Sequence, residues 1–197
     1  MIPKGSFITF EGIDGSGKST QARKLAEHLQ AQGRDVVLTR EPGGSEGAEE
    51  IRALVLQGEP DRWSAETEIL LFPAIEAGKV VICDRFADST RMYQGLSRGD
   101  LRGTVDQLHK LMIGREPDMT ILIDMDSDTG LSRALSRQGV EERFETFGAD
   151  LQAQMRAGFL SLAEEFKERF VVINGARSID EVSVDVCQTV DEHLTTQ

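Results

Sequence analysis

The stretch Phe7-Ile8-Thr9-Phe10-Glu11-Gly12-Ile13-Asp14-Gly15-Ser16-Gly17-Lys18-Ser19-Thr20 decides the fold of this chain. Its first part, Phe7–Glu11, is mostly apolar, as is typical of a strand buried on both faces of a sheet. The next part, Gly12–Ser19, matches the pattern G-x-x-x-x-G-K-[ST] in full, and an amphipathic helical stretch follows it. The sequence therefore predicts a strand, a phosphate-binding loop and a helix in immediate succession.

This loop carries the groups that hold a triphosphate. Its glycines let backbone N–H groups turn toward phosphate oxygens, and the N-terminus of the following helix adds a partial positive charge. Lys18 is expected to neutralise the β- and γ-phosphates, and the Ser19 hydroxyl to ligate Mg²⁺. We therefore predict a nucleoside triphosphate site made of Gly12, Ile13, Asp14, Gly15, Ser16, Gly17, Lys18, Ser19 and Thr20.

The rest of the chain alternates β-type runs with helical stretches. The further strands are expected at Val36–Thr39, Val80–Asp84, Thr120–Asp124 and Phe170–Ile173. The helices are expected at Lys18–Gln32, Gly47–Leu56, Ala65–Phe72, Leu101–Gly114, Asp128–Arg137, Asp150–Arg169 and Ile179–His193. Such alternation gives a parallel sheet with helices on both faces. We expect one α/β domain over residues 1–197, with a five-stranded parallel sheet and a small lid at about residues 133–147.

The composition of the chain limits which partners it can bind and in which cellular compartment it is expected. The 197 residues include 34 acidic and 22 basic ones, and the net charge of −12 disfavours binding to a nucleic acid polymer. The two cysteines, Cys83 and Cys187, stand in apolar runs and are expected to be reduced and packed as small hydrophobic residues. No signal peptide and no membrane-spanning apolar run is evident. We expect a cytoplasmic protein that does not associate with a membrane.

Polar residues at two strand ends are candidates for binding and catalysis. Asp84, at the end of an apolar run, is placed to hold a water of the Mg²⁺ shell, while Arg85 faces incoming phosphate; the alternative is an ordinary ion pair at a strand end. The segment Arg40–Glu46 also follows a strand, at the sheet edge where ligands bind in such folds.

Three other features admit both a functional and a structural interpretation. Thr90 and Tyr93 are three residues apart, close to one helical turn, so both can line one wall of a pocket. Phe72 is either a core residue or a surface on which a base stacks. The third feature is a group of three arginines, Arg133, Arg137 and Arg143. This group belongs either to a solvated helix end or to a lid that closes over phosphates.

Two sequence signatures that are not evident in this chain narrow the class of nucleotide enzyme. A typical GTPase reads guanine with an N-K-x-D element, but the sole asparagine, Asn174, is followed by Gly175-Ala176-Arg177. Large ATPases require a longer chain with further signature strands, and these are not evident. The sequence therefore favours a compact phosphotransferase with a second, small substrate.

Four blocks in the same order resemble the bacterial thymidylate kinase family. They are Phe10–Thr20, the T-R-E-P-G-G block Thr39–Gly44, the D-R-F block Asp84–Phe86 and the Y-Q-G block Tyr93–Gly95. The resemblance runs from about Phe7 to Ile173. It implies a P-loop kinase fold and Mg²⁺-dependent transfer of the γ-phosphoryl group of ATP to dTMP, giving dTDP and ADP. It also implies a homodimer.

The resemblance further implies roles for individual residues at the dTMP site. Phe72 would stack on thymine and Arg85 would hold the dTMP phosphate. Tyr93 would pack against the deoxyribose, where a 2′-hydroxyl would clash, and Asp14 would lie near the metal and the sugar. Thr90 and Gln94 would meet the edge of the base. The full set implied for the substrate is Arg40, Glu41, Pro42, Phe72, Arg85, Ser89, Thr90, Tyr93 and Gln94, and Ser19 and Asp84 are the metal candidates.

Catalysis requires a cation on the transferring phosphoryl group, because negative charge spreads over its equatorial oxygens. Some family members carry that arginine in the phosphate loop, whereas this chain has Gly15 at the corresponding position. The lid arginines are therefore the candidates, although the sequence does not rank them. The expected catalytic set is Lys18, Arg85, Asp14, Arg133, Arg137 and Arg143.

The chain departs from the family pattern after Phe72. Family members continue there with a helix containing A-A-R and then a histidine, whereas here Pro73–Lys79 follows directly and leads into Val80. Either this helix is shortened, or Phe72 and Pro73 are not consecutive in the folded chain. We expect the second, with their Cα atoms much farther apart than ~3.8 Å.

Two alternatives to a dTMP kinase remain open from the residues. One is a kinase for another nucleoside monophosphate or for a deoxynucleoside. The other is a nucleotide-binding module without catalytic turnover, in which the arginine of the family's A-A-R segment, implied by the resemblance to hold the dTMP phosphate as well, is genuinely lost.

Overall fold

The computed structural model describes residues 5–41, 71–95, 101–136 and 148–196. In these ranges five parallel strands form one sheet in the order β2-β3-β1-β4-β5. Every strand lies within one residue of its expected bounds, which confirms the predicted sheet. The strands are β1 Ser6–Glu11, β2 Val36–Arg40, β3 Val80–Asp84, β4 Met119–Asp124 and β5 Phe170–Asn174.

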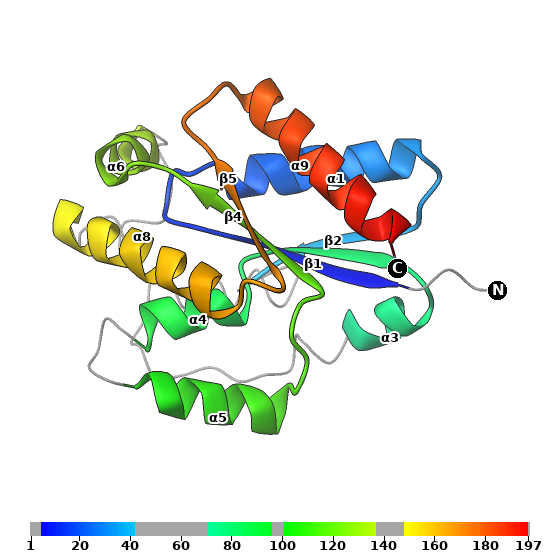
Figure 1. Ribbon diagram of the computed structural model, residues 1–197, viewed down its shortest axis with the longest axis horizontal. Helices are drawn as coiled ribbons and strands as arrows, with labels where there is room; N and C mark the ends of the chain where they lie inside the picture. The colour runs from blue at the N-terminus through cyan, green and yellow to red at the C-terminus, as the bar shows by residue number, and fades with distance from the viewer. Residues whose placement is uncertain (1–4, 42–70, 96–100, 137–147, 197) are drawn as a thin grey trace.

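Helices cover both faces of this sheet (Figure 1). Helices α1 and α9 lie together on one face, while α3, α4 and α8 lie on the other and α5 packs outside α4. Helix α6 lies at the carboxyl ends of the strands, beside the first turn after β1. Their bounds are α1 Lys18–Ala31, α3 Leu71–Glu76, α4 Ala87–Tyr93, α5 Arg102–Met112, α6 Ser127–Leu135, α8 Gly148–Glu165 and α9 Ile179–Thr195.

The core fills the space between the sheet and each helical layer. On one face Leu25 of α1 and Val186 of α9 pack against strand residues such as Ile82, and all three are fully buried. On the other face Phe159 of α8 packs with Leu122 of β4 in a second apolar cluster. All six residues of β1 are buried, so the central strand fixes the position of the loop that follows it.

The expected separation of Phe72 from Pro73 is wrong. Helix α3 runs without interruption from Leu71 to Glu76, through both residues. The helix expected to end at Phe72 therefore continues to Glu76.

Other expectations fall outside the described residues. The predicted helix Gly47–Leu56, most of Ala65–Phe72 and the lid after residue 136 are among them. Within the described ranges, none of the helices combines the length and the apolar character that crossing a membrane requires.

Candidate active site

The loop between β1 and α1 has the backbone conformation that a phosphate cradle requires. Gly12, Gly15 and Gly17 all have positive φ angles, of 136°, 76° and 100°, which residues with a Cβ atom adopt only at a cost. Helix α1 begins directly after them, at Lys18. The buried Lys18 ammonium group donates to the carbonyl oxygen of Ile13 at 2.8 Å. Burial, followed by repulsion from the Arg85 guanidinium, lowers the pKa of Lys18 to about 8.

Helix α6 packs directly against the middle of this loop. A Cβ atom on Gly15 would lie 2.0 Å from the carbonyl oxygen of Gly130 and 3.1 Å from the backbone nitrogen of Ala134. In return, a Cβ atom on Gly130 would lie 2.8 Å from the carbonyl oxygen of Asp14. The two glycines therefore allow a backbone-to-backbone contact, and position 15 has no room for a side chain in this arrangement.

A pair of oxygen donors lies beside the loop. The Ser19 hydroxyl, in the first turn of α1, donates to Asp84 Oδ2 at the end of β3. The other carboxylate oxygen, Asp84 Oδ1, is buried without a hydrogen-bond partner. Hydroxyl and carboxylate oxygens are the ligands that Mg²⁺ prefers, and an unpartnered buried oxygen fits such an ion. Since the described residues contain no cluster of three metal-binding side chains, phosphate oxygens and water would complete its coordination.

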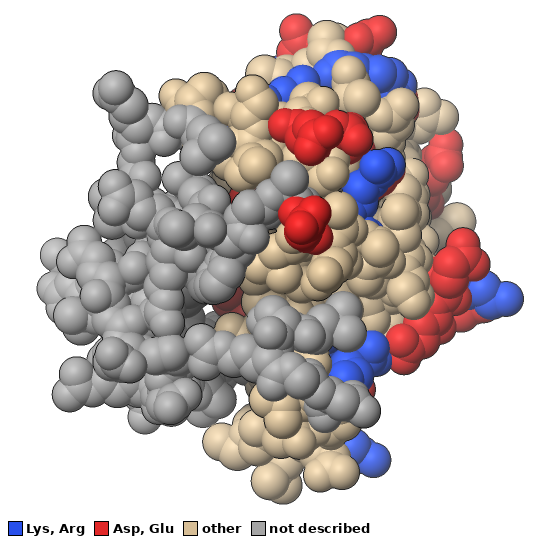
Figure 2. All heavy atoms as spheres, turned by 90° about the vertical axis from the view of Figure 1, so that its left-hand side faces the viewer, with Lys and Arg blue, Asp and Glu red and all other residues tan. Residues whose placement is uncertain are grey.

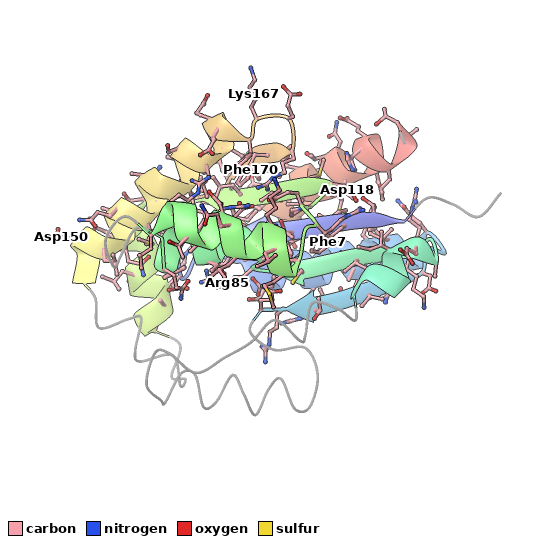
Figure 3. All side chains as sticks on the ribbon, turned by 90° about the horizontal axis from the view of Figure 1, so that it is seen from below. Phe7, Arg85, Asp118, Asp150, Lys167 and Phe170 are labelled. Carbon is pink, nitrogen blue, oxygen red and sulfur yellow. The ribbon has the colours of Figure 1, made fainter. Side chains whose placement is uncertain are left out.

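Arg85 gathers several predicted residues into one cluster. Figure 3 shows its side chain toward the carboxyl ends of the strands, whereas Phe7 lies toward their amino ends. Its guanidinium forms an ion pair with Asp14, donates to the Ser89 hydroxyl at 3.2 Å and lies 5.2 Å from the centre of the Tyr93 ring. The Tyr93 hydroxyl donates to Asp14 Oδ2 at 3.2 Å. Residues that are far apart in the sequence thus meet beside the phosphate loop.

The charge state of Asp14 follows from these neighbours. Burial alone would raise the pKa of Asp14, but the charges of Arg85 and Lys18 outweigh that effect. Hydrogen bonds from Tyr93 and Gln152 act in the same direction as the two cations. The pKa of Asp14 therefore lies below its ordinary value, and the carboxylate is ionised at neutral pH.

Gln152 of α8 was not among the predicted site residues. It is buried, its side chain hydrogen-bonds Asp14, and its Oε1 atom is a buried acceptor without a partner. A signal for it exists in the sequence, because Gln152 is the polar member of a helical stripe whose other members are Met155, Phe159 and Leu162. A polar residue on the buried face of a helix needs a partner, and here that partner is in the site.

The remaining predicted residues lie less centrally or outside the described part. Arg40 is exposed at the end of β2, and the Glu41 N–H donates to the Asp84 carbonyl oxygen at 3.0 Å. Thr90 and Gln94 are exposed. Arg133 is exposed on α6 and donates to the Met125 sulfur at 3.5 Å. Outside the described residues lie Pro42, Arg137, Arg143 and the side chain of Phe72.

The described surface at the carboxyl ends of the strands is not a basic face. Figure 2 shows this side, where acidic groups are more prominent than basic ones. The positive charges of Lys18 and Arg85 are instead largely buried, at the phosphate loop. The positive potential is therefore local, which suits a small phosphate compound.

The fold and this site define a P-loop phosphotransferase. A phosphate loop joins the central strand to a helix, an acid stands at the end of the neighbouring strand, and an arginine faces the loop.

Known proteins place the chain more narrowly. Residues 10–186 match the family model described as thymidylate kinase. A thymidylate kinase from Ruegeria pomeroyi is 70% identical over 207 aligned positions that cover 98% of each chain, and one from Caulobacter vibrioides is 42% identical over 98% of this chain and 99% of its own. The crystal structure of thymidylate kinase from Ehrlichia chaffeensis superposes with a TM-score of 0.71 at 34% identity, covering 96% of this chain and 99% of that one.

The chain therefore belongs to the thymidylate kinase family, and the resemblance carried by the four sequence blocks is confirmed. The alignment with the Ruegeria pomeroyi relative has more positions than the 197 residues of this chain. Some of those positions thus have no residue here, in keeping with a chain that is shortened relative to its relatives.

Proposed function

We propose that the protein transfers the γ-phosphoryl group of ATP to dTMP, giving dTDP and ADP, with Mg²⁺ bound at Ser19 and Asp84. One observation carries this proposal beyond family membership. Lys18, Asp14 and Arg85 converge at the phosphate loop although Arg85 is 71 residues from Asp14 in the sequence. A loop for the donor and a cation for the acceptor thus lie side by side.

The donor triphosphate is held by the chain itself. The backbone N–H groups of residues 12–19 and the N-terminus of α1 surround the phosphates, and Lys18 exchanges its bond to Ile13 for the β- and γ-oxygens. The bound metal ion would neutralise charge on the β- and γ-phosphates. Ser19 and Asp84, whose side chains already lie in contact, would hold it, with the unpartnered Asp84 Oδ1 free to face the ion or its water.

The acceptor phosphate is held by Arg85. In the described arrangement the Arg85 guanidinium pairs with Asp14, and an incoming monophosphate would share that guanidinium. Tyr93 and Ser89 restrain the guanidinium from two sides, so its direction is fixed before the acceptor arrives. Two mutually repelling phosphates are thus brought together by Lys18 and Arg85.

A further cation for the transferring group is assigned to the lid. The close contact between Gly15 and Gly130 leaves no room for an arginine in the loop itself, which supports an arginine supplied from elsewhere. Arg133 lies on the helix that makes this contact, and its exposed side chain is accessible. Arg137 and Arg143 remain candidates on sequence grounds, in a lid at about residues 133–147 of a single domain.

We also propose a homodimer in the cytoplasm. Helix α5 and the residue before it expose four large apolar side chains, with Leu111 at 80% and Met112 at 59% exposure, besides Leu101 and Leu108. A stripe of this kind favours association. The free cysteines Cys83 and Cys187 suit a reducing compartment.

The dimer proposal is tested by Leu111→Glu, with Val184→Glu on α9 as the matched control, because Val184 is also exposed at 64%. Light scattering after gel filtration should give a dimer for the wild type and the control and a monomer for Leu111→Glu. A monomeric wild type, or a dimer that survives Leu111→Glu, contradicts this assignment.

The catalytic proposal is tested by ADP release from Mg·ATP with one acceptor at a time. The acceptors are dTMP, dUMP, AMP, CMP, GMP and thymidine. We expect strong release with dTMP, weaker release with dUMP and little with the others. A stronger response to a different acceptor would indicate another monophosphate or deoxynucleoside kinase, and ATP binding without any acceptor response would indicate a non-catalytic module.

A further inference from the structure

The backbone of Arg85 adopts a conformation that its own side chain does not favour. Arg85 has a φ angle of 69°, and among the described residues it is the one non-glycine residue with positive φ. Such a conformation persists only where the surroundings impose it, and it is often found at functional sites. Two contacts hold the residue itself: its N–H donates to the Phe10 carbonyl oxygen at 2.9 Å, and its carbonyl oxygen accepts from the Cys83 thiol at 3.0 Å.

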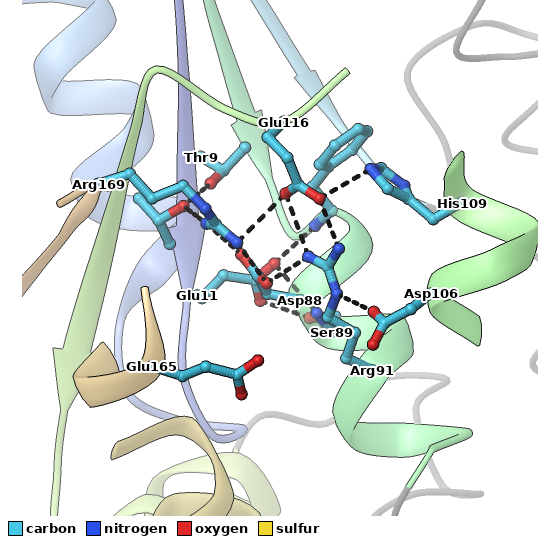
Figure 4. A network of polar contacts seen from close by, with 12 residues as sticks. Thr9, Glu11, Asp88, Ser89, Arg91, Asp106, His109, Glu116, Glu165 and Arg169 are labelled. Carbon is cyan, nitrogen blue, oxygen red and sulfur yellow. Dashed lines mark hydrogen bonds and ion pairs between the residues drawn. The ribbon is translucent and has the colours of Figure 1, made fainter. Parts of the chain in front are cut away.

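The residues that follow Arg85 are held by one buried carboxyl group. Glu11, the last residue of β1, is fully buried and accepts from the Phe86 N–H at 2.8 Å and from the Ser89 N–H at 3.2 Å. Its second oxygen accepts from the Ser89 hydroxyl at 2.6 Å. Figure 4 shows Glu11 and Ser89 together at the start of α4, beside the ion pairs of Asp88.

Ser89 connects this carboxyl group to the guanidinium. The Ser89 hydroxyl donates to Glu11 and accepts from Arg85 Nη1 at 3.2 Å. The chain of contacts therefore runs from Glu11 through one hydroxyl to the guanidinium. The first turn of α4 is also fixed on its other side, because Arg91 and Arg169 hold the fully buried Asp88 at 2.8 and 2.7 Å.

Burying a carboxyl group in its ionised form is unfavourable unless hydrogen bonds or a paired charge compensate for the lost hydration. Burial and the neighbouring charge of Asp88 raise the pKa of Glu11 to about 7, so the site retains a group that is poorly accommodated as an anion. An amide or an alcohol could satisfy two N–H groups without this disadvantage. A carboxyl group adds a second acceptor oxygen, and here that oxygen accepts a hydrogen bond from the Ser89 hydroxyl.

We propose that Glu11 is a positioning residue for the phosphoryl acceptor, which directs the Arg85 guanidinium by holding Phe86 and Ser89. It does not touch the substrate. This inference rests on the proposed function, because it assigns Arg85 to the acceptor phosphate. A displacement of about 1 Å at such a group can reduce turnover by about 10²-fold, so the support beneath Arg85 matters for the rate.

A purely structural role of Glu11 makes a different prediction. If the carboxyl group only completes the start of α4, its loss lowers the stability of the fold and leaves the kinetics of the folded enzyme unchanged. If it positions Arg85, its loss changes the kinetics toward dTMP. The kinetics toward ATP are spared, because Lys18 is held by the Ile13 carbonyl oxygen and neither Lys18 nor the loop glycines are held by the Glu11 carboxyl group.

The test uses the full chain with three single variants. Glu11→Gln keeps the shape and one acceptor oxygen but presents an N–H₂ group to Ser89, and Ser89→Ala removes only the connecting hydroxyl. Thr9→Val is the matched control, because Thr9 is also fully buried on β1 and loses a single bond, to the Thr120 hydroxyl at 2.9 Å. We expect kcat/KM for dTMP to fall at least tenfold in the first two variants, KM for ATP to stay within about twofold, and the control to match the wild type.

A double variant separates positioning from an independent effect. If Glu11 acts through Arg85, adding Glu11→Gln to Arg85→Lys should lower kcat/KM no more than about twofold beyond Arg85→Lys alone. The inference is overturned if the reductions in kcat/KM caused by Glu11→Gln and by Arg85→Lys multiply in the double variant. It is also overturned if the dTMP kinetics are unchanged in both Glu11→Gln and Ser89→Ala. Should Glu11→Gln fail to fold, Ser89→Ala with its own double variant decides the question. A wild-type chain that does not phosphorylate dTMP overturns the proposed function instead, and with it this role of Arg85.

Discussion

Replacing Gly15 by alanine tests the contact between the phosphate loop and α6. The new Cβ atom would lie 2.0 Å from the Gly130 carbonyl oxygen, whereas real Cβ contacts essentially never fall below 3.0 Å. The loop and α6 must therefore separate by about 1 Å, and overpacking of this kind costs roughly 1–3 kcal/mol. The left-handed φ of 76° adds about 1–2 kcal/mol for a residue with a Cβ atom.

Gly33→Ala is the matched control for the energetic cost of placing a Cβ atom on a residue with a left-handed backbone conformation. Gly33 has a similar φ of 81°, but a Cβ atom there would meet nothing within 4 Å. Both variants also restrict the unfolded chain by the same amount, about 0.4–1 kcal/mol. The difference between the two variants thus isolates the steric contact, and we expect Gly15→Ala to be less stable than Gly33→Ala by about 1–3 kcal/mol.

Urea unfolding of both variants and the wild type measures that difference, and steady-state kinetics measure its consequence. Because the loop holds the donor phosphates, a shift of about 1 Å should lower kcat/KM by up to about 10²-fold in Gly15→Ala and leave Gly33→Ala near the wild type. Equal stability of the two variants within about 0.5 kcal/mol, together with normal kinetics of Gly15→Ala, would refute the proposed packing.

Three further predictions concern buried charges. Because the pKa of Glu11 is raised from 4.5 to about 7, its protonated form is favoured by folding, so wild-type stability should fall relative to Glu11→Gln by on the order of 3 kcal/mol as pH rises from about 4.5 to 7. Urea unfolding across this pH range checks it, and parallel curves would contradict it. Because the pKa of Lys18 is lowered to about 8, ATP binding should take up a proton near pH 8–9 and weaken above pH 8. Calorimetry in buffers of different ionisation enthalpy measures this uptake, which Lys18→Arg should abolish. Asp88→Asn removes the buried anion that Arg91 and Arg169 share, while both arginines keep Glu116, and it should cost about 1.5–3 kcal/mol in urea unfolding. Asp185→Asn at the half-exposed pair with Arg177 should cost under about 1 kcal/mol, and similar losses would argue against the buried cluster.

The sheet and the phosphate loop could be predicted because their signals are local. Strand β3, for example, reads as a short apolar run that ends in Asp84, and its observed bounds are those expected. The loop pattern specifies residue types at fixed spacing, because backbone N–H groups must face the phosphates. Such features depend on neighbours in the sequence and little on tertiary context.

The support of the site could not be predicted in the same way. Glu11 reads as the polar end of a strand, and only the folded chain shows that it lies beneath Ser89, 78 residues away. The left-handed backbone of Arg85 is likewise imposed by contacts from β1 and Cys83, since arginine has no preference for it. Gln152 left a signal in the helical pattern, but nothing in that pattern identifies Asp14 as its partner.

The error at Phe72 has a different origin. A family pattern was expected to continue, and its interruption was interpreted as missing chain. Helix α3 instead continues through Phe72 and Pro73 to Glu76. The continuous helix fits the other alternative, a segment that is shortened relative to the family pattern.

The most direct test of the central claim follows the phosphoryl group itself. The purified chain is incubated with Mg²⁺, dTMP and ATP labelled at the γ-phosphate, and the products are separated. The account predicts that the label appears in the β-phosphate of dTDP, in amounts equal to the ADP formed, and that Arg85→Ala reduces this transfer far more than it reduces ATP binding. Label that appears only as inorganic phosphate, or transfer that is unchanged in Arg85→Ala, would contradict it.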